Sequence, residues 1–184
     1  MTFDMRDLIS DKYCGMQRQM HASPRGYGQG GAKWAQAVVD LTKQFEAYSI
    51  LDYGCGAGTL MNTLRRMDLP GVRLAEYDPA IPGKDFLPSF ADIVVCTDVI
   101  EHIQPKRLAN VLAHLKLLTR KACLVVIATR PAKKTLPNGH NAHLIIQGDR
   151  WWRARVEEAG FTVHPGPKSP LKKPSREWVA VLTP

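Results

Sequence analysis

The chain has 184 residues, of which 45% are hydrophobic and 23% charged, the proportions of an ordinary single-domain globular protein. No apolar run reaches the 18 residues that a membrane span requires, and the first segment, MTFDMRDLISDKYCG, lacks the apolar stretch of a secretory signal. The net charge of +8 favours an acidic partner such as nucleic acid or a phosphorylated small molecule, but a solvated basic face has the same composition.

The positive charge is concentrated in two segments. One follows an expected strand and the other lies near the end of the chain: Arg130, Lys133 and Lys134, then Lys168, Lys172, Lys173 and Arg176. Either segment would suit a phosphate-bearing partner.

The cysteines indicate a reducing compartment. Cys14, Cys55, Cys96 and Cys123 are scattered and form no C-x-x-C pair. Cys96 and Cys123 lie in apolar runs, which favours buried thiols over disulfides or zinc ligands. We therefore expect a cytoplasmic protein with reduced cysteines.

The first 31 residues differ in composition from the rest. They contain Pro24 and five glycines between Gly15 and Gly31. We expect an irregular arm or lid over 1–31, followed by one domain over 32–184.

The remaining elements alternate between helices and strands. Apolar residues three to four apart predict the helices, and short apolar runs predict the strands. In chain order we expect a helix over 32–47, a strand at 49–53, a helix ending near Pro70, strands at 72–77 and 92–97, a helix from Pro105 to about 118, a strand at 122–129, a helix over 149–159, and two closing strands, FTVH and EWVAVLT. This order predicts an α/β sheet with helices on both faces, and the long loop at 130–148 is expected to be functional.

The most informative stretch is LDYGCGAG at 51–58, which follows a strand and opens a helix. A dinucleotide site requires G-x-G-x-x-G, so that a pyrophosphate can lie on the helix N-terminus. Here the third glycine comes one residue early and an acid, Asp52, precedes the loop. A carboxylate repels a pyrophosphate but holds an ammonium group, so the pattern favours a nucleoside that carries an amino acid.

D-x-G-x-G-x-G after the first strand resembles the hallmark of class I S-adenosylmethionine-dependent methyltransferases. The resemblance implies a three-layer, Rossmann-like α/β sandwich, with a mostly parallel sheet closed by an antiparallel C-terminal hairpin. It also implies S-adenosylmethionine as cofactor. The loop residues that it assigns to the cofactor are Asp52, Gly54, Cys55, Gly56 and Gly58.

Two further marks of this family match. An acid that ends the second strand takes the ribose hydroxyls in the family; Asp78, followed by Pro79, corresponds to it, and Glu76 is a weaker candidate. The segment DIVVCTDVIEH matches the family strand that passes the methionine end of the cofactor, which implies that Thr97 and Asp98 lie near it.

The chain departs from the family between Asp78 and Asp92. The intervening residues are too few for the usual helix and third strand, so we expect a fold reduced around 79–91. The adenine contacts of the family therefore have no direct counterpart. Asp85 and Phe86 are the nearest substitutes, as an acceptor for the adenine amino group and a stacking ring.

The segment from Asp98 to His102 also resembles the metal-binding E-x-x-E-H segment of RNA 3′-terminal 2′-O-methyltransferases. Asp98, Glu101, His102 and a later histidine, His140 or His143, would form an oxygen- and imidazole-rich site for magnesium or manganese. Glu-His after this strand is widespread in methyltransferases without metal, and the first position is an aspartate here. A site without metal is therefore the main expectation.

The loop at 130–147 follows the fifth strand of the family, at the sheet edge where ligands bind. A histidine near its reference pKa is a natural general base for a hydroxyl or amine acceptor. His143 and His140 are the first candidates, with His102 next and Asp98 beside them. The alternative for each histidine is a hydrogen bond that orders the loop.

The arm also has counterparts in related small methyltransferases, in which such arms cover the cofactor. Tyr13, Gln17, His21 and Tyr27 lie in the matching part of the sequence, before a glycine-rich stretch that suits a hinge. A disordered tail is the competing interpretation.

The sequence thus favours methyl transfer to an oxygen or nitrogen nucleophile of an acceptor it does not identify. The alternative is a non-catalytic nucleic-acid-binding or scaffold protein with the same fold. A nicotinamide-dependent oxidoreductase is disfavoured by the glycine spacing. The oligomeric state stays open.

Overall fold

The computed structural model describes residues 3–23, 27–67, 69–170 and 176–184. In these residues six strands form one sheet in the order β2-β1-β3-β4-β6-β5. Their bounds are β1 Ser49–Tyr53, β2 Arg73–Tyr77, β3 Ala91–Thr97, β4 Thr119–Ala128, β5 Thr162–Pro165 and β6 Glu177–Thr183. The first four strands run parallel, and β6 pairs antiparallel with both β4 and β5. The predicted parallel sheet with an antiparallel closing pair is confirmed.

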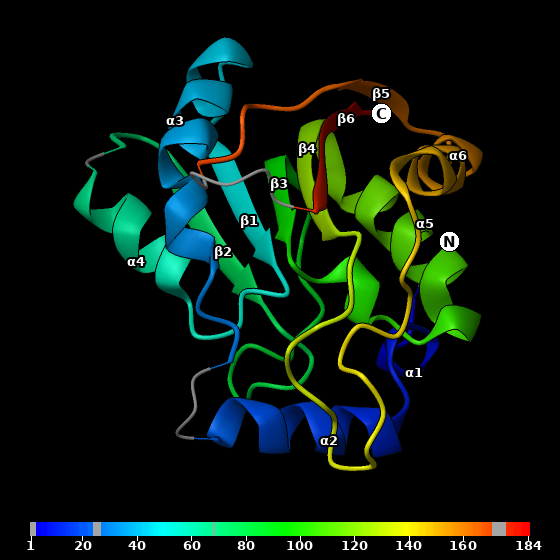
Figure 1. The fold of residues 1–184 in the computed structure, drawn as a ribbon. Coiled ribbons are helices and arrows are strands. Elements are labelled where there is room, and N and C mark those ends of the chain that lie inside the picture. Colours follow the sequence, from blue (N-terminus) through cyan, green and yellow to red (C-terminus); the bar gives the residue numbers. More distant parts are fainter. Residues whose placement is uncertain (1–2, 24–26, 68, 171–175) are drawn as a thin grey trace.

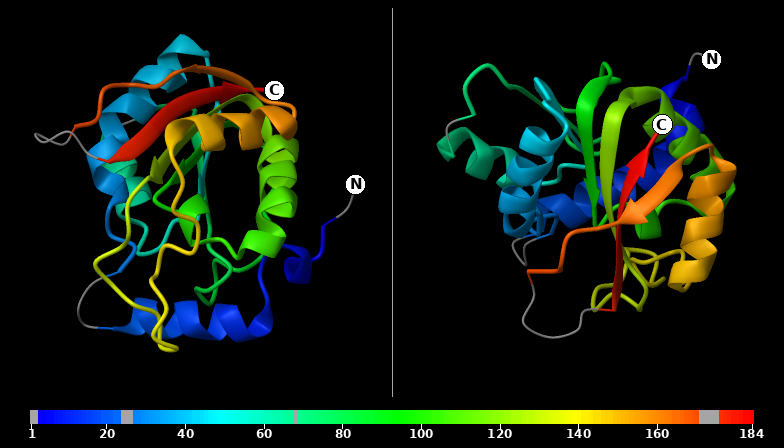
Figure 2. Two further views of the ribbon diagram at one scale, coloured as in Figure 1. Left: turned by 45° about the vertical axis from the view of Figure 1, so that its right-hand side comes forward. Right: turned by 90° about the horizontal axis from the view of Figure 1, so that it is seen from above.

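Helices cover both faces of this sheet (Figures 1 and 2). The α-helices are α1 Met5–Leu8, α2 Asp11–Ala22, α3 Ala35–Gln44, α4 Thr59–Arg66, α5 Leu108–Leu118 and α6 Asp149–Glu158. Short 3₁₀ turns occur at η1 Gly31–Trp34, η2 Ile100–His102 and η3 Pro105–Arg107. Helices α3 and α4 lie on one face and α5 and α6 on the other, which confirms the three-layer α/β prediction. None of the described helices has the length and apolar character needed to cross a bilayer.

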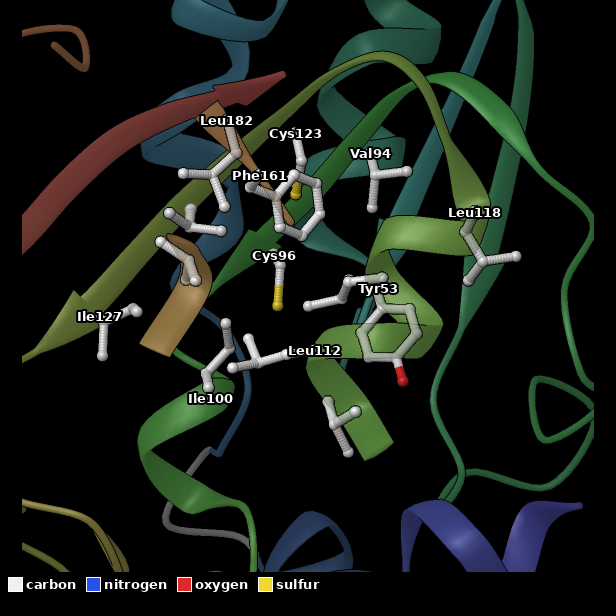
Figure 3. Close-up of a cluster of buried hydrophobic side chains, with 14 of the residues drawn as sticks. Tyr53, Val94, Cys96, Ile100, Leu112, Leu118, Cys123, Ile127, Phe161 and Leu182 are labelled. Carbon is white, nitrogen blue, oxygen red and sulfur yellow. The ribbon is translucent and has the colours of Figure 1, made fainter. Parts of the chain in front are cut away.

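Each face of the sheet has its own apolar core. Trp34, Val38 and Leu60 pack with Ile50 and Leu124 on the side of α3 and α4. On the side of α5 and α6, the core joins strand residues to helix residues, including Cys96, Cys123, Leu112 and Phe161 (Figure 3). Both cysteines are buried free thiols, as expected.

The sheet is shortened where the sequence predicts it. Strand β3 pairs directly with β1, and β2 pairs with β1 at the edge of the sheet. Residues 78–90 form neither a helix nor a strand. The prediction of a reduced fold around 79–91 is therefore confirmed.

The arm is more ordered than expected, and the prediction of an irregular segment is wrong for 11–22. Helix α2 begins after Ser10, whose hydroxyl caps it by accepting the Tyr13 amide (3.3 Å). Tyr13 and Gln17 are buried against the domain. The helix forms because this cap and this packing outweigh the cost of Gly15 in its interior.

Helix α2 lies across the carboxyl ends of the parallel strands and meets the long loop at 130–148 (Figure 1). Ile9 and Tyr13 of the arm form a separate small cluster with Leu136 and Ala142 of the loop. These two segments, far apart in sequence, thus lie side by side at the edge where α/β sheets bind ligands.

Candidate functional site

A cleft of about 450 Å³ opens between the strand ends, helix α2 and the loop at 130–148. It brings together residues from five separate parts of the sequence. Its lining includes the following sequence-predicted residues: Tyr13, Gln17, His21 and Tyr27 from the arm, Gly54 and Gly56 from the glycine loop, Asp78 and Pro79 after β2, Asp98 and His102 after β3, and Arg130, Lys133, Lys134 and His143 from the long loop. This convergence makes the cleft the candidate active site.

All five amides of the glycine loop are already hydrogen-bonded within the protein. Their acceptors are the Tyr77 carbonyl for Gly54 and Cys55 (2.7 and 3.0 Å), the Asp78 carboxylate for Gly56 (3.0 Å), the Gly28 carbonyl for Ala57 (3.0 Å) and the Cys55 carbonyl for Gly58 (2.9 Å). A dinucleotide loop instead offers free amides to a pyrophosphate. The hydrogen bonds therefore agree with the glycine spacing in disfavouring a dinucleotide.

Two of these glycines are required by close approaches. Gly56 has φ +50°, and a Cβ there would lie 2.6 Å from the Gly28 carbonyl oxygen of the arm. Gly54 has φ +76°, and a Cβ there would lie 2.5 Å from a methyl group of Val99. A side chain at either position would therefore push the arm or the β3 end away from the loop.

Asp52 lies at the end of β1 beneath the loop and is buried. Burial raises the pKa of its carboxyl to about 7, and the nearby acids Glu76 and Asp78 raise it further, against the effect of Lys84. A cationic ligand group would stabilise the charged form of this carboxyl.

Asp78 is the anchor of the turn after β2. Its two oxygens accept the amides of Gly56 (3.0 Å) and Ala80 (2.9 Å). His21 Nε2 of the arm lies 3.8 Å from Asp78 Oδ2. A carboxylate has about four acceptor sites, so capacity remains for ligand hydroxyls.

Three cofactor candidates from the sequence do not line the cleft. Phe86 is 79% exposed, and Asp85 accepts the Gly83 amide (3.1 Å) and pairs with Arg18 at 3.5 Å. Thr97 ends β3, half-buried, behind Asp98. The roles predicted for these three stay predictions.

Asp98 stands in an uncommon backbone conformation, with φ +55°. Its carboxylate pairs with Lys33, which follows the arm, at 3.3 Å. Such strained residues cluster at functional sites, because the surrounding structure must hold them in place. Lys33 itself was missed from the sequence, since no local pattern links it to a residue 65 positions away.

Glu101 is fully buried behind the cleft. Its Oε1 accepts the Ala128 amide (2.9 Å), while Oε2 has no hydrogen-bond partner among the described residues. Burial, with the negative charge of Asp98 nearby, raises its pKa to about 8.

His102 and His143 form an edge-to-face pair with ring centroids 4.7 Å apart. His102 Nδ1 lies 2.8 Å from the Ala142 carbonyl, and His143 Nδ1 lies 2.6 Å from the Arg130 carbonyl. Because a carbonyl only accepts, each Nδ1 carries the proton and each Nε2 keeps its lone pair. Burial lowers the pKa of both rings, that of His102 to about 3.

Asn141 holds His143 in place. Its side-chain oxygen accepts the amides of Ala132 and His143 (both 2.9 Å), and its amide group donates to the Ala132 carbonyl (2.9 Å). His140, by contrast, is exposed and does not line the cleft. The structure thus places His102 and His143 together and leaves His140 apart.

Glu101, His102 and His143 each offer one ligand atom, all within 4.8 Å of one another. Asp98, the fourth member of the predicted metal set, does not belong to this group and pairs with Lys33 instead. Three of the four predicted ligands therefore converge.

Comparisons with known proteins agree with this geometry. The family described as "Methyltransferase domain" matches residues 19–166. A search of curated protein sequences gave no match. Among solved structures, the chain resembles the 1,6-didemethyltoxoflavin-N1-methyltransferase of Burkholderia thailandensis, with a TM-score of 0.68 and 14% identity over 95% of this chain and 90% of that one.

Two more distant likenesses concern the fold alone. A putative O-methyltransferase of Nostoc punctiforme gives a TM-score of 0.55 and 15% identity; 83% of this chain is covered, but only 56% of that one. The methyltransferase domain of bacterial CtHen1 gives a TM-score of 0.51 and 18% identity over 83% of this chain and 98% of that one. With the match over residues 19–166, the glycine loop, Asp78 and the order of the strands, the chain belongs to the class I S-adenosylmethionine-dependent methyltransferase family.

Proposed function

We propose that this chain transfers the methyl group of S-adenosylmethionine to an oxygen or nitrogen nucleophile of an anionic acceptor. One observation carries the proposal: a single cleft is lined by the residues expected to bind the cofactor and by a histidine able to accept a proton. The Burkholderia N1-methyltransferase, which has the same fold, was solved with S-adenosylhomocysteine and its acceptor bound.

When bound, S-adenosylmethionine supplies a sulfonium methyl group that a nucleophile can attack. Asp52 would hold the ammonium end of the cofactor and Asp78 its ribose hydroxyls. Asp98 and Val99, which also line the cleft beside Gly54, would border the methionine end. Binding in the cleft excludes water and orients the donor toward the acceptor.

His143 is the proposed general base. The Arg130 carbonyl fixes the proton on Nδ1, so Nε2 is left to accept a proton from the acceptor. Asn141 orients the histidine through its backbone amide. This arrangement suits a hydroxyl or amine whose proton must leave as the methyl group arrives.

The basic rim supports an acceptor that carries a phosphate or another anionic group. Arg130, Lys133 and Lys134 line the cleft on the same loop as His143. In the second basic segment, Lys172 and Lys173 lie outside the described residues. Phosphate contacts of this kind position a ligand and depend on salt.

The test begins with thermal-shift titrations of the wild type and Asp78→Ala with S-adenosylhomocysteine and with NAD. A ligand at about 100 times its dissociation constant adds roughly 2.7 kcal/mol of stability. Stabilisation by S-adenosylhomocysteine alone, lost in Asp78→Ala, supports the proposal. Salt-dependent binding of RNA or DNA without any response to S-adenosylhomocysteine supports the non-catalytic alternative.

Acceptor screening then compares each nucleoside or sugar with its phosphorylated form. We expect methyl transfer to the phosphorylated member, and a rate constant at low acceptor concentration that falls as salt rises. Equal rates for both members would contradict the anionic acceptor while leaving methyl transfer intact.

A second candidate is metal-assisted transfer in the same cleft. The observation that favours it is the convergence of Glu101, His102 and His143, with Glu101 Oε2 buried and without a partner among the described residues. Both histidines donate Nδ1–H to a carbonyl, as metal-bound histidines do, and so present Nε2 as a ligand. One carboxylate and two imidazoles suit manganese or another transition ion better than magnesium.

A divalent cation held there would polarise an acceptor hydroxyl. Electron paramagnetic resonance with Mn²⁺ tests the site in the wild type and in Glu101→Gln, which preserves shape. Binding that Glu101→Gln abolishes, with transfer lost on chelation, favours the metal. Absent Mn²⁺ binding with transfer that survives chelation favours His143 as the base.

A further inference from the structure

The reduced segment after β2 folds into a tight turn. The Asp78 amide donates to the Lys84 carbonyl (2.9 Å), and the Lys84 amide donates to the Ile81 carbonyl (3.0 Å). This closure holds Ile81 and Pro82 next to Asp78. The turn therefore replaces the missing helix and strand with a small apolar ledge beside the proposed ribose anchor.

A second hollow of about 610 Å³ lies on this ledge. Three parts of the chain enclose it: the turn with Ala80, Ile81 and Pro82, the glycine loop with Ala57, and the end of helix α2 with Arg18 and Ala22. The hollow shares four lining residues with the cleft: His21, Tyr27, Gln29 and Ala80. The two spaces are therefore neighbours with a common wall.

Asp78 lies at this common wall. His21, which lines both spaces, has Nε2 3.8 Å from Asp78 Oδ2. A nucleoside held at Asp78 by its ribose would therefore extend in two directions. Its amino-acid end reaches Gly54 and Asp98 in the cleft, and its base enters the hollow.

We infer that this hollow receives the adenine base of the cofactor, with helix α2 of the arm as one wall of the base pocket. The inference rests on the proposed function. Ile81, Pro82 and Ala57 offer apolar surface to a flat ring, and Arg18 supplies a guanidinium plane on the side of α2. Gln29 carries an amide able to donate to and accept from the adenine edge.

The arm is then part of the binding site and not only a cover over a complete pocket. Neither of the sequence-predicted adenine residues belongs to this hollow. Phe86 is 79% exposed and Asp85 is turned to Gly83 and Arg18. The missing strand thus transfers the base contacts from the sheet to the arm.

The test fills the hollow from the side of the arm. Ala22 is the last residue of α2, exposed, and lines the hollow, so Ala22→Trp places a ring inside it without disturbing a core. Gln19→Trp is the matched control, because Gln19 is exposed on the same helix and lines neither space. Calorimetry measures the dissociation constants of S-adenosylhomocysteine and adenosine for each protein.

We expect Ala22→Trp to raise both constants by roughly tenfold or more, the scale of losing a stacked base, and Gln19→Trp to leave both within about twofold of the wild type. Ile81→Ala, on the opposite wall, should weaken both ligands as well. Unchanged constants in Ala22→Trp and Ile81→Ala overturn the inference, and so does a loss in Phe86→Ala that these variants lack.

The wild-type titration separates this inference from the proposed function. If the wild type binds neither S-adenosylhomocysteine nor adenosine, both fall together. If it binds S-adenosylhomocysteine and Ala22→Trp binds it as tightly, the base lies elsewhere and methyl transfer stands.

Discussion

The two halves of the cleft differ in how their polar groups are satisfied. On the side of β1 and β2, Asp78 accepts two backbone amides, and every amide of the glycine loop has an acceptor. On the side of β3 and β4, Glu101 Oε2 has no partner in the described chain, and Asp98 is held at φ +55°. The first half is a finished frame, whereas the second keeps atoms ready for a ligand.

Loss of the Asp78 carboxylate should be the most damaging change to the finished half. Asp78→Ala leaves the amides of Gly56 and Ala80 without acceptors, at a cost of about 1–3 kcal/mol each, and removes the ribose anchor. We expect a lower urea midpoint and no measurable stabilisation by S-adenosylhomocysteine. Asp78→Asn, which keeps one acceptor oxygen, should retain more stability than Asp78→Ala. Full cofactor binding by Asp78→Ala would contradict this assignment.

His143→Ala tests the other half. Removal of a general base lowers the rate constant of transfer by about 10²–10⁴-fold, while cofactor affinity stays unchanged because His143 lies on the acceptor side. Single-turnover transfer and calorimetry with S-adenosylhomocysteine measure the two effects separately. His140→Ala is the comparison, since His140 is exposed and outside the cleft. An equal rate loss in both variants would show that His143 has no special role.

Asp52→Asn should reverse the usual relation between activity and stability. Burial raises the pKa of Asp52 to about 7, against about 3.9 in an unfolded chain. Between these values the folded state holds more protons, so the free energy of unfolding falls as pH rises. The asparagine does not titrate. The variant should therefore be more stable than the wild type above pH 7 by about 2–4 kcal/mol, yet bind S-adenosylhomocysteine more weakly.

The matched measurement for Asp52→Asn is urea unfolding at about pH 4, where both states of the wild type are protonated. The difference in stability between variant and wild type should vanish there. A difference that is the same at both pH values would have another origin than this carboxyl.

Lys33→Met should have the smallest effect. Its pair with Asp98 is partly exposed, with side-chain exposures of 26% and 37%, so the loss in unfolding free energy should stay below about 1 kcal/mol. Thermal unfolding at low and high salt measures it, because screening should remove most of the difference. A loss of several kcal/mol would mean that Lys33 holds Asp98 in its strained conformation.

The sequence was a good guide to the finished half because its signals are local. The run at 49–53 and the following glycines give a strand, a turn and a helix in consecutive residues, and Asp78 directly follows the next strand. The shortened segment before Asp92 could be read from its length alone. Burial and backbone bonds around these residues need no distant partner to be predicted.

The other half depends on contacts between distant segments. Asn141 clasps Ala132 and thereby selects His143 over His140, which no spacing along the chain reveals. Helix α2 was missed because Gly15 interrupts a mostly polar segment, and its stability comes from packing against the loop at 130–148. The metal alternative has the same origin: Glu101 and His102 are adjacent, but His143 joins them only in the folded chain.

The shortened sheet has a consequence for how copies of this protein meet one another. Strand β2 forms an open edge of the sheet, and an open edge is a template for pairing with a strand of another molecule. The strand has only five residues and carries Arg73 and Glu76, and Arg65 of helix α4 and Lys84 of the turn both pair with Glu76 (3.1 and 2.9 Å). Short length and charge discourage such pairing, so the loss of one strand need not lead to aggregation.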